Sequence, residues 1–249
     1  MKWRILKLEK NDAFMNMAID EAIANAVAKG TSLPTIRFYE WKPDAVSIGY
    51  FQGMNDEIDV DACKKQNVDT IRRRTGGGAV YHDEIGEITY SVIAPESIMP
   101  KGITESYHLI CGWIIDSLEL LGIKAEFKPI NDVITNGKKI SGNAQTRRNG
   151  VLLQHGTVLY DVNVEKMFSL LKVSQEKIAD KLIEDVKERV TSVRQQKPKI
   201  TKDKVYDAMV KGFTEGKDFD FGFLSEEEMI EASMLVETRY KKEEWNFMR

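Results

Sequence analysis

The sequence has too few cysteines and histidines for a disulfide-rich or metal-rich protein. Its 249 residues include two cysteines, Cys63 and Cys111, and three histidines, His82, His108 and His155. Neither set has the spacing of a metal site, and two cysteines cannot build the disulfide framework of a small secreted domain. We therefore expect a cytoplasmic protein whose thiols stay reduced.

Long apolar runs and an excess of positive charge are also lacking. The opening residues, MKWRILKLEK, do not contain the apolar core of a signal peptide, and no run is long enough to span a bilayer. The net charge of -3 argues against the basic surface of a nucleic-acid-binding protein. We expect neither a membrane nor a nucleic acid as a partner.

Strand-like and helix-like segments alternate through the first two-thirds of the chain. Alternating apolar residues predict strands over 3–9, 35–41 and 45–52. Apolar residues at helical spacing predict helices over 11–29 and 105–121. This mixture of elements, with hairpins among the strands, predicts an α+β fold with mixed or antiparallel sheets and packed helices.

Turn signals divide the remaining segments. Residues 79–95 resemble a hairpin that turns near 84–86, and Asn-Gly pairs at 136–137 and 149–150 predict two tight hairpins. From 163 onward the pattern is helical and charged, including the run over 175–187. We expect one domain over 1–249, with a hairpin-rich core over 1–162 and a helical C-terminal part over 163–249.

The stretch IRRRTGGGAVYHD, residues 71–83, places three arginines beside three glycines. Adjacent guanidinium groups repel one another unless an anion lies near them. The glycines leave their backbone N–H groups unshielded, so a phosphate or carboxylate can approach closely. A tight turn with solvated arginines would give a similar pattern, but the His82-Asp83 pair that follows favours an anion site. At most two of the three arginines share a face, and the alternation leaves open which of them faces the site.

Two further stretches, GKKISGNAQ and QHGTVLY, carry polar residues on predicted hairpins. Lys138 and Lys139 follow a turn and point to opposite faces of the sheet, so the inward lysine needs an anionic partner. Two solvated lysines would produce the same sequence. His155 alone is more typical of a structural histidine than of a catalyst.

Taken in order, RRRTGGGAVYHD, NDVITNGKKISGNAQ and LLQHGTVLYDV resemble the motifs of the lipoate–protein ligase family, within the group of biotin and lipoate ligases and octanoyltransferases. NMAIDEA, IRFYEWKPDAVSIGYFQ, RVTSV and YKKEEWN are further matches, so the likeness covers essentially the whole chain. The resemblance implies the catalytic-domain fold of the biotin and lipoate ligases. Because the sequence stops soon after Trp245, it also implies a short form without the family's C-terminal accessory domain.

The resemblance implies an ATP-dependent ligase that uses Mg²⁺. Lipoate would react with ATP to give lipoyl-AMP and pyrophosphate, and a lysine of an acceptor protein would then take the lipoyl group. The acceptor would be of the glycine cleavage H protein or 2-oxoacid dehydrogenase E2 lipoyl-domain type. A separate accessory polypeptide is implied for the adenylation step.

The resemblance also implies roles for individual residues. Lys139 matches the family's catalytic lysine and would contact both carboxyl and phosphate oxygens. Asp132 is the implied ligand of Mg²⁺, and Tyr39, Trp41 and Tyr50 would form the apolar wall of a lipoyl tunnel. The residues implied to bind substrate or adenylate are Arg72, Arg74, Gly76, Gly77, Gly78, Ala79, Tyr81, His82, Asn131, Asp132, Ser141, Gly142, His155 and Gly156.

Two alternatives accompany the ligase prediction. Related transferases move octanoyl or lipoyl groups between carrier proteins through a cysteine thioester, and their nucleophile lies just before the segment that matches NDVITNGKKISG. The corresponding segment here, GIKAEFKPI, has no cysteine, and neither Cys63 nor Cys111 is expected to be a nucleophile. The other alternative is a protein that binds lipoate or a lipoylated protein without catalysis. The sequence favours the ligase over both.

Overall fold

The computed structural model describes residues 1–172 and 188–249. The helical run predicted over 175–187 lies outside these residues. The strands are β1 (Trp3–Asn11), β2 (Thr35–Trp41), β3 (Ala45–Ile48), β4 (Asp69–Arg72), β5 (Val80–His82), β6 (Glu87–Pro95), β7 (Glu126–Lys128), β8 (Asp132–Thr135), β9 (Lys138–Arg148), β10 (Val151–Leu159) and β11 (Phe219–Gly222). The helices are α1 (Ala13–Lys29), α2 (Met54–Glu57), α3 (Val60–Lys65), α4 (Ile103–Leu120), α5 (Val164–Leu170), α7 (Val193–Gln196), α8 (Lys202–Thr214), α9 (Glu226–Leu235) and α10 (Glu243–Asn246), with a 3₁₀ turn at Glu96–Ile98 and a π-helical turn at Val236–Tyr240.

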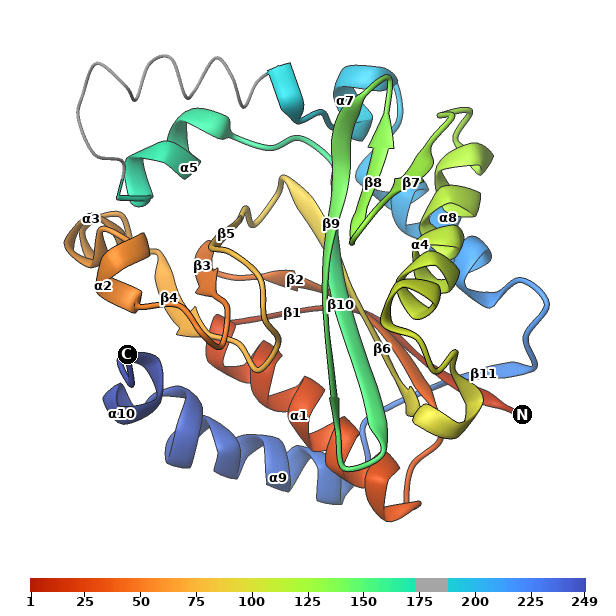
Figure 1. Cartoon of the computed structure of the whole chain (residues 1–249), viewed down its shortest axis with the longest axis horizontal. Helices are drawn as coiled ribbons and strands as arrows, with labels where there is room; N and C mark the ends of the chain where they lie inside the picture. The colour runs from red at the N-terminus through yellow and green to blue at the C-terminus, as the bar shows by residue number, and fades with distance from the viewer. Residues whose placement is uncertain (173–187) are drawn as a thin grey trace.

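The strands form two sheets. The large sheet has eight strands in the order β11-β1-β2-β6-β10-β9-β8-β7 (Figure 1). Strand β1 is parallel to both of its neighbours, and the other pairs of this sheet are antiparallel. The small sheet has the order β4-β3-β5. The fold is therefore α+β with a mixed large sheet, as the sequence predicts.

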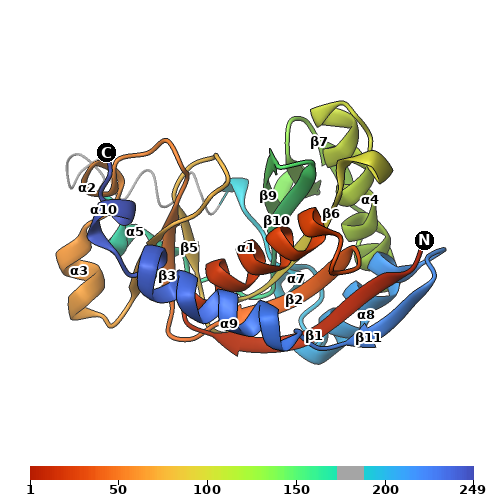
Figure 2. The same cartoon turned by 90° about the horizontal axis from the view of Figure 1, so that it is seen from below.

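Helices cover both faces of the large sheet. Alternate residues of β2 separate two hydrophobic cores, because successive side chains of a strand point to opposite faces. Ile36 and Phe38 pack with residues of α4 and α8. Tyr39 and Trp41 pack with residues of α1 and of the C-terminal helices. Figures 1 and 2 show α1 and α9 running side by side. A third, smaller core joins the small sheet to α3 and α5.

Local signals fix the ends of α1 and the two predicted hairpin turns. The side chain of Asp12 accepts the backbone N–H of Met15 at the start of α1, and Gly30 ends the helix with φ +72°. Both Asn-Gly pairs have positive φ at both residues, and they join β8 to β9 and β9 to β10. The predictions of this helix and these hairpins are confirmed.

The hairpin predicted over 79–95 is wrong. Strand β5 pairs with β3 in the small sheet, whereas β6 pairs with β2 and β10 in the large sheet. Between them the carboxylate of Asp83 accepts the N–H groups of Ile85 and Gly86, which turns the chain from one sheet to the other. The C-terminal part also contains strand β11, which the sequence analysis did not predict. Within 1–172 and 188–249, no helix is both long and apolar enough to cross a membrane.

Candidate active site

A cavity of about 320 Å³ is lined by residues of both sheets. Strands β2, β6, β9 and β10 contribute from the large sheet, and β3, β5 and the glycine loop (residues 76–78) contribute from the small sheet. Val162, Val164 and Met167, around the start of α5, line it as well. The predicted site residues that line this cavity are Tyr39, Trp41, Gly77, Gly78, Ala79, Tyr81, His82, Asn131, Lys139, Gly142, His155 and Gly156.

Six other predicted residues are not among those lining the cavity. Two of them, Gly76 and Ser141, are next to lining residues in the sequence, and Asp132 contacts Lys139. Arg72 and Tyr50 contact Trp245, and Arg74 contacts Glu21.

The glycine loop packs against the backbone beside it. Gly77 has φ +96°, a conformation that favours glycine, and a Cβ there would lie 2.9 Å from Nη2 of Arg73. A Cβ on Gly49 would lie 2.1 Å from the carbonyl oxygen of Gly77. Neither position has room for a side chain, so this close packing explains two glycines of the region.

Arg73 is the arginine that lines the cavity. The residue is 4% exposed, and all five of its side-chain N–H groups are used. They bind carbonyl and hydroxyl oxygens, and no carboxylate of the described residues lies within 4.0 Å of its guanidinium. Burial lowers the pKa of Arg73 to about 10, which leaves it cationic at neutral pH. The cavity wall therefore holds a positive charge with no direct counter-ion among the described residues.

The neighbouring arginines have different surroundings. The guanidinium of Arg72 donates to backbone carbonyls of the 49–52 turn and of Trp245 and Asn246, which ties that turn to α10. Arg74 forms an ion pair with Glu21 of α1, with Nη1 3.1 Å from Oε1. Strand β4 ends at Arg72, and Arg73 shares none of the side-chain partners of Arg72 or Arg74.

Lys139 reaches the cavity from the start of β9. Its Nζ lies 2.7 Å from Oδ1 of Asp132, and its side chain is 40% exposed. The amine lies over Gly142, where a Cβ would come within 2.7 Å of it. The anionic partner expected for an inward lysine is therefore present. Asn131, beside Asp132, is held by hydrogen bonds to and from Asn143.

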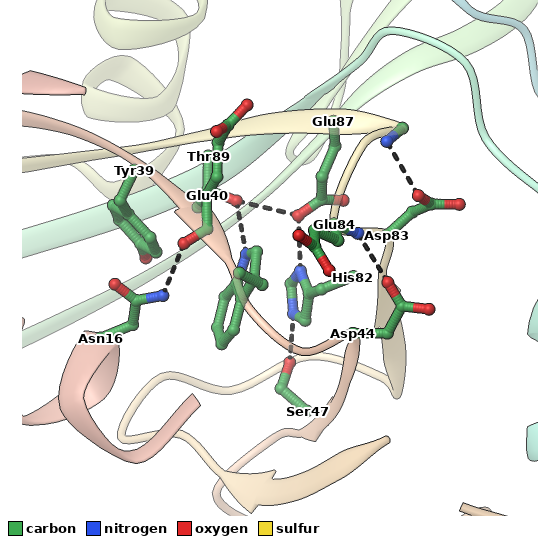
Figure 3. A network of polar contacts seen from close by, with 12 residues as sticks. Asn16, Tyr39, Glu40, Asp44, Ser47, His82, Asp83, Glu84, Glu87 and Thr89 are labelled. Carbon is green, nitrogen blue, oxygen red and sulfur yellow. Dashed lines mark hydrogen bonds and ion pairs between the residues drawn. The ribbon is translucent and has the colours of Figure 1, made fainter. Parts of the chain in front are cut away.

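His82 lies at the centre of a buried polar network (Figure 3). Its Nδ1 is 2.7 Å from Oε1 of Glu87, and its Nε2 is 2.8 Å from Oγ of Ser47. The ring stacks on Trp41, with centroids 3.9 Å apart. Trp41 donates from Nε1 to Thr89, whose hydroxyl donates to Glu87. Each polar atom of the aromatic stack therefore has a partner.

His155 lies in a second buried polar cluster. Its Nε2 is 2.8 Å from Oγ1 of Thr75, and its Nδ1 is 3.5 Å from Oδ2 of Asp20. Asp20 also accepts hydrogen bonds from Arg37 and Ser91. Burial lowers the pKa of His155, and Asp20 opposes this shift. The imidazole is therefore neutral at neutral pH.

Both cysteines are buried and lie outside the cavity lining. Burial raises the pKa of Cys63 to about 11 and that of Cys111 to about 12. A thiolate is the nucleophilic form of cysteine, and such pKa values leave almost none at neutral pH. The cavity therefore offers no reactive thiol from this chain.

The side chains at the cavity could supply few ligands to a metal ion, so a metal here would be bound mainly through a substrate. Among the described residues, no group of three or more His, Cys, Asp or Glu side chains is arranged to hold a metal ion. Mg²⁺ is commonly bound by one or two carboxylates together with phosphate oxygens. Asp132, with its side chain 30% exposed beside Lys139, fits that limited role.

Sequence reasoning missed several residues that line the cavity. The alternation of Arg72–Arg74 indicated two faces but not which face meets the cavity. The small and apolar lining residues had no distinguishing signal. The residues not predicted as site residues are Met17, Ser47, Arg73, Thr89, Asn143, Ala144, Thr157, Leu159, Val162, Val164, Met167 and Val190.

Comparisons with known proteins agree on one family. The model of the lipoyl protein ligase A/B catalytic domain matches residues 12–214. Octanoyltransferase LipM of Brevibacillus brevis is 34% identical, over 100% of this chain and 99% of the relative. A bi-partite lipoate protein ligase of Thermoplasma acidophilum, described with its E2 lipoyl domain, superposes with a TM-score of 0.90 and 35% identity over 99% of this chain and 96% of its own. A lipoate-protein ligase A bound with ATP gives a TM-score of 0.85 and 33% identity over 99% of both chains.

Proposed function

The chain belongs to the family of the lipoyl protein ligase A/B catalytic domain, and from this we propose that it transfers an octanoyl or lipoyl group to a lysine of a lipoyl-accepting protein. The observation that carries the proposal is a cavity between two cations, the fixed Arg73 and the half-exposed Lys139. An acyl group whose carbonyl lies there meets positive charge where negative charge develops during transfer.

Octanoyl transfer between carrier proteins is the first candidate for the reaction. Its support is that LipM, named an octanoyltransferase, matches this chain over its full length, so the relatives favour transfer over the ATP-dependent ligation predicted from the sequence. The amine of the acceptor lysine attacks the thioester carbonyl, the C–N bond forms, the C–S bond breaks, and the departing thiolate takes up the proton. Lys139 stabilises the oxyanion of the tetrahedral intermediate.

ATP-dependent ligation is the second candidate. It is favoured because no cysteine is among the residues that line the cavity. Transferases that work through an enzyme thioester need a reactive cysteine, and neither cysteine of this chain lines the cavity. In the ligase reaction the lipoate carboxylate attacks the α-phosphate of ATP and pyrophosphate leaves. The acceptor amine then attacks the mixed anhydride and releases AMP. Lys139 would contact the carboxyl and phosphate oxygens, and Asp132 would hold Mg²⁺, which neutralises phosphate charge when bound.

The test supplies each of the two acyl donors, in separate reactions, to the same protein. An apo lipoyl domain is incubated either with an octanoyl-acyl carrier protein and no ATP, or with lipoate, ATP and Mg²⁺, and its mass is measured. ATP–pyrophosphate exchange with lipoate separates the candidates, because only the ligase exchanges label. The ligase arm is repeated with a separate accessory polypeptide, since the Thermoplasma acidophilum neighbour is described as bi-partite. An acceptor that stays unmodified in every arm overturns the proposed function.

The double variant Cys63→Ser, Cys111→Ser tests the role of the thiols. We expect acyl transfer to stay within about twofold of the wild-type rate, because the thiolate required of a cysteine nucleophile is suppressed at both positions. An acyl thioester found on either cysteine by mass spectrometry contradicts this expectation and assigns the reaction to a cysteine-dependent transferase.

A further inference from the structure

Arg73 lies between two similar chains of polar groups. On one side Nη1 donates to Oγ of Ser47 at 3.1 Å, and on the other side Nε donates to Oγ1 of Thr75 at 3.2 Å. Each hydroxyl also binds a buried histidine, His82 or His155. Beyond each histidine lies a carboxylate. The guanidinium is therefore flanked by two hydroxyl–histidine–carboxylate chains.

The hydrogen-bond directions along the first chain follow from the donors available. Arginine has no acceptor, so Ser47 accepts from Arg73. The carboxylate of Glu87 accepts from Nδ1 of His82, and in that tautomer Nε2 accepts the hydroxyl proton of Ser47. Glu87 thereby fixes the tautomer of the imidazole, and the imidazole fixes the rotamer of Ser47 (Figure 3).

The second chain has the same directions. Thr75 accepts from Arg73. The neutral imidazole of His155 carries its proton on Nδ1, the nitrogen that faces the Asp20 carboxylate, so Nε2 accepts from Thr75. That Nδ1 lies 3.5 Å from Asp20, an electrostatic contact longer than an ordinary hydrogen bond. Thr75 is fully buried and is not among the residues that line the cavity. Its hydroxyl therefore reaches the site through the two side chains that it binds, Arg73 and His155, which both line the cavity.

The remaining donors of Arg73 hold the glycine loop. Nη2 donates to the carbonyl of Gly76 at 2.9 Å and to that of Gly78 at 2.7 Å. In a planar trans peptide the N–H of the next residue points opposite to the carbonyl. Fixing these two carbonyls toward Arg73 therefore directs the N–H groups of Gly77 and Ala79 away from it. The direction of the loop's N–H donors depends on where the guanidinium lies.

We propose that Ser47 and Thr75 are positioning residues that hold Arg73, and through it the glycine loop, in the geometry needed for acyl transfer. The inference rests on the proposed function for the step that it serves. It assigns the two buried histidines to orienting these hydroxyls. A guanidinium plane fixed by two hydroxyls cannot rotate without breaking its contacts with Gly76 and Gly78, so the loop keeps one arrangement.

The test compares three threonine variants. Thr75→Val keeps the shape of the side chain but removes the hydroxyl, and Thr75→Ser keeps the hydroxyl. The matched control is Thr35→Val, because Thr35 is also fully buried and its hydroxyl accepts from Nε of Arg4 at 3.0 Å, outside the cavity lining. Thr75→Val and Thr35→Val therefore each remove one buried threonine hydroxyl that binds an arginine Nε.

We expect Thr75→Val to lower kcat for acyl transfer by about 10- to 100-fold, because small misplacements of reacting groups have effects of that size. The KM for the acceptor protein should stay within about threefold, since a loss confined to the transition state lowers kcat alone. Thr75→Ser should restore kcat, and Thr35→Val should leave it unchanged. Hydrogen exchange of the 71–83 segment should be faster in Thr75→Val than in the other two variants.

Three outcomes would overturn the inference. Equal kcat losses in Thr75→Val and Thr35→Val would show a general loss of stability. A normal kcat in Thr75→Val would show that its hydroxyl does not position the site. A stable acyl ester on Ser47, detected by mass spectrometry, would make that serine catalytic. Hydrogen exchange reports on the loop without any substrate, so a failure of the proposed function is distinguishable from a failure of this inference.

Discussion

The two cations that line the cavity are held in opposite ways. Arg73 is 4% exposed and donates five hydrogen bonds to oxygens of Ser47, Thr75 and the glycine loop. Lys139 has a 40% exposed side chain and an ion pair with Asp132. A half-exposed ion pair contributes only about 0–1 kcal/mol, so it exchanges easily for another anion. Arg73 therefore fixes the shape of the site, whereas Lys139 can move with the oxygen on which negative charge develops.

The largest expected effect is on Lys139. Replacing it by Ala should lower acyl transfer at least about 100-fold, since a positioned electrostatic donor is worth that much or more in the rate. The melting temperature should change little, because the lost ion pair is half exposed. Steady-state transfer assays and thermal unfolding of the same sample provide the two measurements.

Lys138→Ala is the control for Lys139→Ala, because it removes a neighbouring lysine of the same hairpin that is not among the cavity-lining residues. Near-normal transfer by Lys139→Ala, or an equal loss in both variants, would remove the distinction between a fixed and a movable cation.

A second effect concerns stability and sets Arg73 apart. Arg73→Met should lower the free energy of unfolding by about 2–4 kcal/mol, because it leaves buried hydroxyl and carbonyl oxygens without their donor. Chemical denaturation of Arg73→Met and Lys139→Ala in parallel measures the contrast. Equal free energies of unfolding for the two variants would show that Arg73 contributes no more to the stability of the fold than Lys139.

The smallest expected effect is the pH dependence of the free energy of unfolding that arises from His155. Because burial lowers the pKa of His155 in the folded protein, the unfolded chain binds a proton first as the pH falls below about 6.5. The free energy of unfolding should therefore decrease from neutral pH into the acidic range. His155→Gln removes this group, so its melting temperature should fall less steeply with pH than that of the wild type. Parallel slopes would show that His155 does not contribute.

Local signals in the sequence were enough for the elements that depend on nearby residues. The Asn-Gly turns need positive φ at consecutive positions, and few other residue pairs provide it. Helix α1 has both its capping residues within the sequence that forms it. Strand alternation predicted an anionic partner for one of the two lysines of this hairpin, and the resemblance to the family singled out Lys139, which pairs with Asp132.

Features that depend on distant partners were not predictable in the same way. Strands β5 and β6 are adjacent in the sequence, and only their pairing with β3, β2 and β10 shows that they belong to different sheets. Strand β11 carried a usable signal, the alternating Phe219, Phe221 and Phe223, that the charged helical surroundings obscured. The orientation of Arg73 depends on Ser47 and the glycine loop and had no local signal.

The passage of the chain between the two sheets has a consequence for access to the cavity. The chain leaves the large sheet through residues 42–44 and returns to it through 83–86. Asp44 ties these connections together, since its Oδ1 accepts the backbone N–H of Glu84 at 2.7 Å (Figure 3). The segment after β4 is also joined to β10 by the contact of Thr75 with His155, and to α1 by the ion pair of Arg74 with Glu21. Rotation of one sheet against the other would therefore widen the cavity only if these contacts break, whereas the contact at Asp44 could persist.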